Sequence, residues 1–189
     1  GDADFGTLSI DGDDDTPTVV VSGTAPNLTV DESNFANNDT QNLSGLFNSS
    51  FGADGAGTTS YTLGVVAGPS GLVDTLTGQA VNLSLNGTVV EGKTTGGLLV
   101  FTLTVDASGN VTLDQSRAVI HSPNVNANDI ETLAANLVTL TKTITDHDGD
   151  SASATANIGD HLLFADDGPS ALAGETAGTV DEDGLTGGI

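Results

Sequence analysis

The sequence predicts an all-β fold: a Greek-key (immunoglobulin/cadherin-like) β-sandwich with one short helix and a long loop. Short segments rich in Val, Ile, Leu and Thr alternate along the chain with Gly, Asn and Asp, the residues that favour turns. In the clearest segment, residues 98–105, side chains alternate as they do on the two faces of a strand. Aromatic residues make up only 4% of the chain and Trp is absent, which suits a thin aliphatic core between two sheets.

Strands are expected wherever such a segment is bounded by turn residues. Asn86-Gly87 and residues 106–110 are typical of hairpin turns, because Gly and Asn accept the left-handed backbone that tight turns require. The expected strands are residues 19–21, 61–66, 80–85, 89–90, 98–105, 111–113, 118–120, 137–145 and 151–158.

Two segments depart from this pattern. Residues 128–137 predict a short helix of about two turns, because Asn128 can cap the first turn, Glu131 stands three residues later and apolar residues share one face. Residues 31–57 are rich in Asn, Ser and Gly and predict a long loop, with one helical turn inside it as an open alternative. We expect that loop to be held by its apolar side chains, which are Phe35, Leu43, Leu46, Phe47 and Phe51.

The charge of the chain is strongly unbalanced. Lys93, Arg117 and Lys142 are the only basic side chains against 26 acidic ones, which gives a net charge of −23. Such a chain repels nucleic acids and anionic membranes, so we expect no nucleic-acid partner, and no apolar run is long enough for membrane insertion. Divalent cations are the expected counter-charge. An acidic surface solvated by water, as in halophilic or marine proteins, is the alternative explanation.

Internal repetition organises the chain. Asp14-Asp15-Thr16-Pro17 returns 152 residues later as Asp166-Asp167-Gly168-Pro169, and Val30-Asp31-Glu32 returns 150 residues later as Val180-Asp181-Glu182. Two matched pairs at nearly equal spacing indicate a tandem array. We therefore predict a linker from the preceding repeat at 1–16, a β-sandwich repeat at 17–167 and the start of the next repeat at 168–189. The first residue is not Met, so we expect the chain to be part of a longer protein.

The sharpest local motif is Asp146-His147-Asp148-Gly149-Asp150. Alternate carboxylates in a tight loop direct oxygen atoms towards one centre, and clustered oxygen ligands suit Ca²⁺. The motif differs from a helix-flanked calcium loop, because Asn157 stands where that loop needs Glu. We predict that Asp146, Asp148 and Asp150 bind Ca²⁺ together with ligands from elsewhere in the fold. An acidic β-turn without metal is the alternative.

A second group of acidic residues lies at the two predicted junctions, each followed by Pro. In a Greek-key sandwich the last hairpin loop lies at the end where the chain enters, so residues 146–150 should face the preceding linker. We expect this loop to share ions with the aspartates of the first junction, and Glu32 to face those of the second; a solvated acidic linker is the alternative. The predicted junction ligands are Asp13, Asp14, Asp15, Glu32, Asp166 and Asp167.

The sequence offers no catalytic constellation, so we predict that the protein is not an enzyme. His121, His147 and His161 are scattered without metal-binding spacing, and no Gly-x-Ser-x-Gly elbow occurs. Carboxylates are too abundant for one pair to stand out as a glycosidase dyad. His121, which precedes Ser122-Pro123 at the end of an expected strand, is expected to be structural, with ligation as the alternative.

These motifs together resemble the tandem extender repeats of giant type I-secreted adhesins, the repeats-in-toxin-type (RTX) surface proteins of Gram-negative bacteria. The resemblance covers nearly the whole chain, and order and spacing carry it because the individual motifs are short. The matching stretches are Asp54-Gly55 before Tyr61-Thr62-Leu63, Val100-Phe101-Thr102-Leu103, Gly109-Asn110-Val111-Thr112-Leu113, Asp146-His147-Asp148-Gly149-Asp150 and Phe164-Ala165-Asp166-Asp167-Gly168-Pro169.

The resemblance implies an extracellular module of the bacterial cell surface, exported unfolded by type I secretion and folded by millimolar Ca²⁺ outside the cell. Such repeats space a terminal binding region from the cell in adhesion and biofilm formation, and Ca²⁺ at the junctions stiffens the rod. The implied ligands are Asp146, Asp148, Asp150 and the junction aspartates. Asp15-Thr16-Pro17 departs from the Asp-Gly-Pro of the second junction, which leaves the ligand set of the first junction open.

The implied partners are neighbouring repeats of the same chain, with a host-surface or biofilm ligand bound through other domains, and the module is expected to be monomeric. The alternative function is a binding module for a glycan or a protein within the same adhesin. Sugar sites usually offer a stacking ring, and this chain has one Tyr, Tyr61, and no Trp, which favours the spacer. Residues 31–57 are the segment in which a ligand site would be sought.

Overall fold

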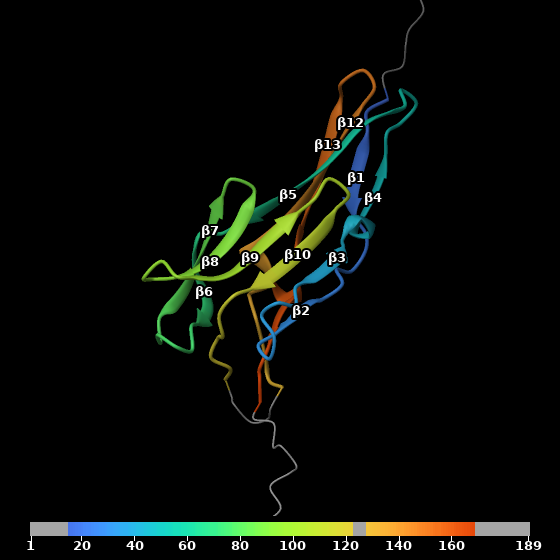
Figure 1. Cartoon of the computed structure of the whole chain (residues 1–189). Helices are drawn as coiled ribbons and strands as arrows, with labels where there is room; N and C mark the ends of the chain where they lie inside the picture. The colour runs from blue at the N-terminus through green and yellow to red at the C-terminus, as the bar shows by residue number, and fades with distance from the viewer. Residues whose placement is uncertain (1–14, 123–127, 169–189) are drawn as a thin grey trace, which may run out of the picture.

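The computed structural model describes residues 15–122 and 128–168, and this part of the chain is almost entirely β-structure (Figure 1). Its only helical segments are three single 3₁₀ turns, η1 (Ser44–Leu46), η2 (Ala135–Leu137) and η3 (Gly159–His161). None of the described helical segments has the length or apolar character needed to cross a membrane. The strands are β1 (Thr18–Val21), β2 (Leu28–Asp31), β3 (Asp39–Asn42), β4 (Phe47–Ser50), β5 (Ala56–Val65), β6 (Gly68–Val73), β7 (Ala80–Asn86), β8 (Val89–Thr94), β9 (Leu99–Val105), β10 (Asn110–Gln115), β11 (Ile130–Thr132), β12 (Val138–Asp146), β13 (Ser151–Asn157) and β14 (Leu162–Ala165).

The strands form one large sheet and three small ones. The six-stranded sheet has the order β3-β10-β9-β8-β7-β6, and the smaller sheets have the orders β13-β12-β5, β11-β14-β2 and β1-β4. Among the described strands, all pairs are antiparallel except β14 and β2, which run parallel with Ala165 opposite Asp31. This parallel pair places the end of an early strand beside the end of the last described strand.

The core lies between the six-stranded sheet and the smaller sheets, so the arrangement is sandwich-like. Phe101 of β9 and Phe164 of β14 are both fully buried, and their ring centroids lie 5.1 Å apart. In β9 the Thr side chains at 102 and 104 are more exposed than their apolar neighbours, as the alternation of residues 98–105 predicts. Val100 is buried as well, at a bulge where the register with β8 shifts. The all-β class is confirmed.

The predicted helix at 128–137 is wrong. Ile130–Thr132 form β11, which pairs with β14, and only Ala135–Leu137 make a 3₁₀ turn. The capping pattern of Asn128 and Glu131 was compatible with a helix, but the exposed edge of β14 offers backbone hydrogen bonds that a free helical turn does not. Helical propensity over so few residues is too weak to compete with pairing along a sheet.

The predicted long loop at 31–57 is also wrong in part. It contains β3, which pairs with β10 at the edge of the large sheet, and β4, which pairs with β1. The residues of β3 are polar because both strand faces are at least partly accessible at this edge. Three of the five expected apolar anchors are buried, Leu43, Leu46 and Phe47, whereas Phe35 is 40% exposed.

The described chain begins and ends at opposite ends of an elongated domain (Figure 1). The hairpin between β12 and β13 lies at the end where β1 begins, and β14 runs towards the other end. The strands lie within the predicted repeat 17–167. The described chain therefore enters the domain at one end and leaves it at the other.

Candidate metal centres

One group of carboxylates, which we call the hairpin cluster, consists of Asp54, Asp146 and Asp148. Each offers an oxygen atom, and these atoms lie within 4.8 Å of one another. Asp146 is the last residue of β12, Asp148 belongs to the turn before β13, and Asp54 comes from the turn between β4 and β5. The pairing of β12 with both β5 and β13 brings these turns together.

Asp146 is the best-formed ligand of the hairpin cluster. Its side chain is buried, and its Oδ1 accepts hydrogen bonds from the backbone N–H groups of Gly149 (3.0 Å) and Asp150 (2.7 Å). Its Oδ2 is buried with no hydrogen-bond partner among the described residues. A buried oxygen without a donor is costly, so one carboxylate oxygen builds the turn and the other remains for a ligand.

The protonation of the hairpin cluster reflects two carboxylates in close contact. Burial opposes ionisation of Asp146, but hydrogen bonds from Asp148, Gly149 and Asp150 outweigh it and lower its pKa. The pKa of Asp148 is raised, first by its hydrogen bond with Asp146, then by burial and by the negative charges of Asp146 and Asp54. A cation bound between the two carboxylates would remove this repulsion.

The segment that precedes β1 lies against the hairpin cluster. The carboxylate of Asp15 accepts a hydrogen bond from the N–H of Ala53 (2.9 Å), and the N–H of Asp15 donates to Asp54 (3.3 Å). Gly52 has a φ of +77°, and a Cβ there would lie 2.7 Å from the carbonyl oxygen of Asp15. A glycine is therefore needed for this close approach.

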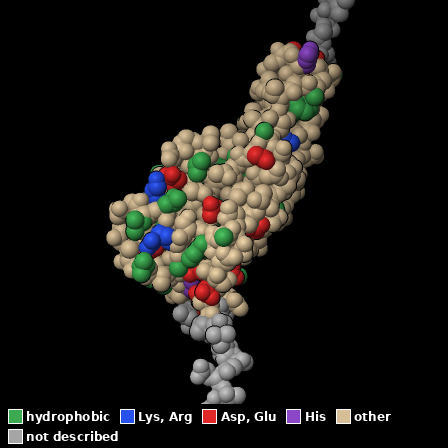
Figure 2. All heavy atoms as spheres, viewed as in Figure 1, with side chains coloured by type: hydrophobic (Ala, Val, Ile, Leu, Met, Phe, Trp, Pro, Cys, Tyr) green, Lys and Arg blue, Asp and Glu red, His purple; other side chains and the backbone are tan. Residues whose placement is uncertain are grey.

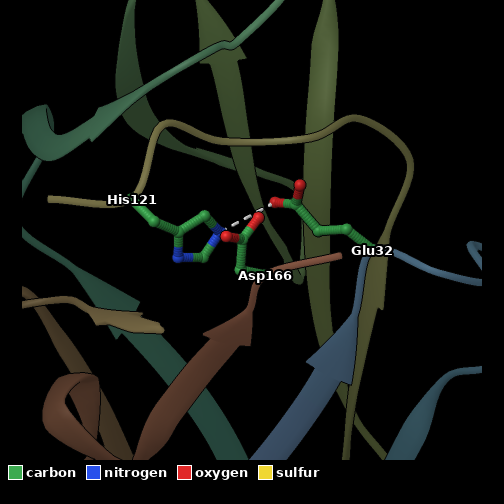
Figure 3. Close-up of side chains that lie close together, drawn as sticks. All are labelled: Glu32, His121 and Asp166. Carbon is green, nitrogen blue, oxygen red and sulfur yellow. Dashed lines mark hydrogen bonds and ion pairs between the residues drawn. The ribbon is translucent and has the colours of Figure 1, made fainter. Parts of the chain in front are cut away.

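The second group, which we call the histidine cluster, consists of Glu32, His121 and Asp166 (Figure 3). Glu32 directly follows β2 and Asp166 directly follows β14. Because these strands are parallel and in register at their ends, the next residue of each emerges beside the other. The backbone N–H of Glu32 donates to the carbonyl oxygen of Ala165 (3.2 Å) and fixes this juxtaposition.

Glu32 is held tightly within the histidine cluster. Its Oε1 accepts hydrogen bonds from the N–H of Val119 (2.7 Å), from Gln115 Nε2 (3.2 Å) and from His121 Nε2 (3.2 Å). The side chains of Glu32 and His121 are only 6% and 2% exposed. Beside them lies a cavity of about 390 Å³ whose wall includes Asp166 and Asp167, so the cluster is accessible to small ions from one side.

No basic side chain neutralises either cluster in the part of the chain that the structure describes. Lys93 pairs with Glu91, Arg117 with Asp74, and Lys142 donates to Ser49. On the face seen in Figure 2, the few Lys and Arg side chains (blue) lie beside Asp and Glu side chains (red). Neither cluster therefore has a Lys or Arg counter-charge in the described part of the chain.

The structure brings some of the ligands predicted from the sequence together and not others. It brings together Asp146 and Asp148 at one end and Glu32 and Asp166 at the other, with Asp15 and Asp167 beside them. Asp150 serves the hairpin cluster through its backbone N–H. Asp13 and Asp14 lie outside the described residues. Metal binding by these residues stays a prediction.

Sequence reasoning missed two members of the clusters. Asp54 was noted only as part of a matching stretch, although an Asp-Gly pair before a strand is a signal for a turn that exposes a carboxylate. His121 was expected to be structural, and nothing in the local sequence indicates that it meets Glu32, 89 residues away.

The structure thus defines an all-β, sandwich-like domain with a carboxylate-containing cluster at each end. The family model described as "Domain of unknown function (DUF5801)" matches residues 27–159, and the chain belongs to this family. The match includes both turns of the hairpin cluster as well as Glu32 and His121, whereas Asp15, Asp166 and Asp167 lie beyond it. Comparisons with curated proteins and with solved structures give no match.

Proposed function

We propose that this chain is a structural extender repeat of a bacterial surface adhesin, stiffened by Ca²⁺ at its junctions and serving cell adhesion and biofilm formation. In this proposal the fold is a Greek-key sandwich of the immunoglobulin/cadherin type, exported by type I secretion and displayed outside the cell. Its partners are neighbouring repeats of the same chain. The observation that carries the proposal is the position of two ligand clusters at opposite ends of the domain, where flanking repeats would attach.

The internal repeat supports a junction at which one Asp-Asp pair contributes to the histidine cluster of one repeat and to the hairpin cluster of the next. Asp166-Asp167 corresponds to Asp14-Asp15, 152 residues earlier. Asp15 contacts the hairpin cluster through Asp54, whereas Asp166 belongs to the histidine cluster. In a tandem chain, the first aspartate of each such pair would therefore complete the histidine cluster of one repeat. The second would lie at the hairpin cluster of the next.

The chemistry of the hairpin cluster supports Ca²⁺. All its ligand atoms are carboxylate oxygens, and Ca²⁺ takes six to eight oxygen ligands in flexible geometry. Asp148 is exposed, so water molecules can complete the coordination. The family resemblance points the same way, since it implies a module that folds where Ca²⁺ is millimolar. The proposed ligands here are Asp54, Asp146 and Asp148, supported by Asp15 and Asp150.

The proposal is tested by thermal unfolding with Ca²⁺ and with chelator. At a Ca²⁺ concentration 100-fold above Kd, binding stabilises the folded state by about 2.7 kcal/mol, a rise in Tm of about 5 to 10 °C for a domain of this size. The double variant Asp146→Asn with Asp148→Asn should lose this rise. The matched control Asp160→Asn, an exposed carboxylate outside both clusters, should keep it. An equal rise in the double variant would refute the proposed site.

A second candidate function, binding of a glycan or a protein, has one observation in its favour. A hollow of about 440 Å³ lies beside Phe35 and Leu76, which are 40% and 83% exposed, with Arg117 in its wall. Tyr61, by contrast, packs against Phe47 and lies close to Lys142, so its ring is already partly engaged. Binding of the chain to a glycan array, abolished by Phe35→Ala, would favour this second function over the spacer.

A further inference from the structure

We infer that the histidine cluster, Glu32, His121 and Asp166, is a binding site for a transition-metal ion of the Zn²⁺ class and differs in metal preference from the hairpin cluster. The inference concerns residues of a single repeat. It holds or fails independently of whether the protein is an adhesin extender and of whether the hairpin cluster binds Ca²⁺.

The donor atoms carry the inference. Ca²⁺ is bound in proteins by oxygen atoms, whereas Zn²⁺ is bound by imidazole nitrogen together with carboxylate oxygen. The histidine cluster offers one imidazole nitrogen and two carboxylates, and the hairpin cluster offers carboxylates alone. The two clusters therefore differ in their donor atoms: one has nitrogen and oxygen, and the other has oxygen only.

The geometry fits a small ion. Two ligands that each lie about 2.0 to 2.1 Å from a tetrahedral Zn²⁺ are separated by roughly 3.3 Å. His121 Nε2 and Glu32 Oε1 lie 3.2 Å apart, and all three ligand atoms lie within 4.8 Å of one another. The ion would replace the hydrogen bond between these two atoms, and the neutral imidazole would then carry its proton on Nδ1. Figure 3 shows the carboxylates of Glu32 and Asp166 and the imidazole edge of His121 converging on one point. A modest movement of the Asp166 carboxylate would bring the third ligand within bonding distance of the ion.

The surroundings support the site in two further ways. Hydrogen bonds from Val119 N–H and Gln115 Nε2 hold the Glu32 carboxylate in place, as outer partners commonly do for metal ligands. The adjoining cavity of about 390 Å³ gives an ion access and leaves room for water or Asp167 as a fourth ligand. The described residues that line this cavity include no Lys or Arg that would compete with a cation.

Calorimetric titration with Zn²⁺ tests the inference, using the whole chain freed of metal by chelation and dialysis. Wild type should bind one Zn²⁺ at this site in the presence of millimolar Ca²⁺. His121→Gln and Glu32→Gln should each weaken that binding at least tenfold. His147→Asn, in the hairpin turn, and His161→Asn, which contacts Asn27, are the matched controls and should leave it unchanged. Undiminished binding in His121→Gln, or its loss in His147→Asn, would overturn the inference.

A second measurement covers variants that fail to fold. The chain has three His residues, so their ring ¹⁵N signals can be resolved in the wild-type protein. Zn²⁺ should shift the Nε2 signal of His121 and leave His161 unmoved, and Asp166→Asn, a change at a partly exposed position, should abolish the shift. If the His121 signal does not move at saturating Zn²⁺, or if Ca²⁺ displaces Zn²⁺ from it, the site is not of the proposed kind.

Discussion

Both ends of the domain carry a group of close carboxylates, but the two groups are assembled in different ways. The hairpin cluster is local in origin, because two of its three carboxylates come from one five-residue turn. The histidine cluster is assembled from three segments far apart in the sequence, brought together by a parallel strand pair. The first is therefore tied to the stability of a turn, and the second to the integrity of the whole sandwich.

The largest effect should come from Phe164→Ala. This change empties a fully buried site against Phe101 and should lower the free energy of unfolding by about 3 to 5 kcal/mol. Because Phe164 lies two residues before Asp166, the histidine cluster should lose its metal affinity while the hairpin cluster keeps its own. Denaturant unfolding and metal titrations check both effects. Equal loss at both ends would show that the clusters are not independent.

Asp146→Ala should have the next largest effect, at the opposite end. It removes the acceptor for two backbone N–H groups, so Tm should fall by about 5 to 10 °C even in chelator. Asp146→Asn keeps an acceptor oxygen and should fall less. Thermal unfolding followed by circular dichroism measures both, and an alanine variant as stable as wild type would mean that the turn does not depend on this side chain.

Acid should act on Asp74 and Asp148 in opposite ways. The hydrogen bonds and charge of Arg117 lower the pKa of buried Asp74 from 3.8 to about 2. This ion pair is close to the histidine cluster, since Thr75 lines the same cavity. A lowered pKa contributes stability that is present above pH 4, about 2 kcal/mol here, and is lost as pH falls towards 2.

Asp148 has a raised pKa, so in chelator its own contribution has the reverse sign: it is greatest at low pH and declines as pH rises above 4. The lowered pKa of Asp146 acts in the opposite direction at the same end. Unfolding curves of Asp74→Asn and Asp148→Asn between pH 2 and 6 separate the two contributions. In Asp74→Asn the free energy of unfolding should fall less steeply as the pH drops towards 2. In Asp148→Asn it should decline less as the pH rises above 4. Curves that match wild type in both variants would contradict these assignments.

Lys93→Ala should have the smallest effect, about 0.5 kcal/mol or less. Its ion pair with Glu91 is at the surface of the large sheet, remote from both clusters, and such pairs contribute little. Metal affinity at both ends should be unchanged. A change in either affinity would show that the net charge of the domain, and not the local ligands, governs binding.

The fold class could be predicted because β-structure leaves its pattern in short stretches. The alternation along residues 98–105 and the hairpin signal at Asn86-Gly87 correspond to β9 and to the turn between β7 and β8. The edge strand β3 could not be predicted, because its Asp, Thr, Gln and Asn residues carry no apolar period. The helix predicted at 128–137 failed for a related reason. A short segment with weak helical propensity forms a strand when the edge of a sheet is available to pair with it.

The candidate sites divide in the same way. The turn at 146–150 could be found from its own residues, since spacing alone brings its carboxylates together. The histidine cluster depends on the pairing of β2 with β14, which lie more than 130 residues apart and give no local signal. His121 is placed only when Val119, its near neighbour, pairs with Asp74 and bonds to Glu32.

The parallel pairing of β14 with β2 also has a mechanical consequence. β14 runs towards the end at which the described chain leaves the domain, and it is bonded on one side to β2 and on the other to β11. Tension applied to the two ends of the domain would act along β14. The hydrogen bonds on both of its sides would then be sheared together and could not be peeled apart one at a time. A domain built in this way resists pulling along its long axis.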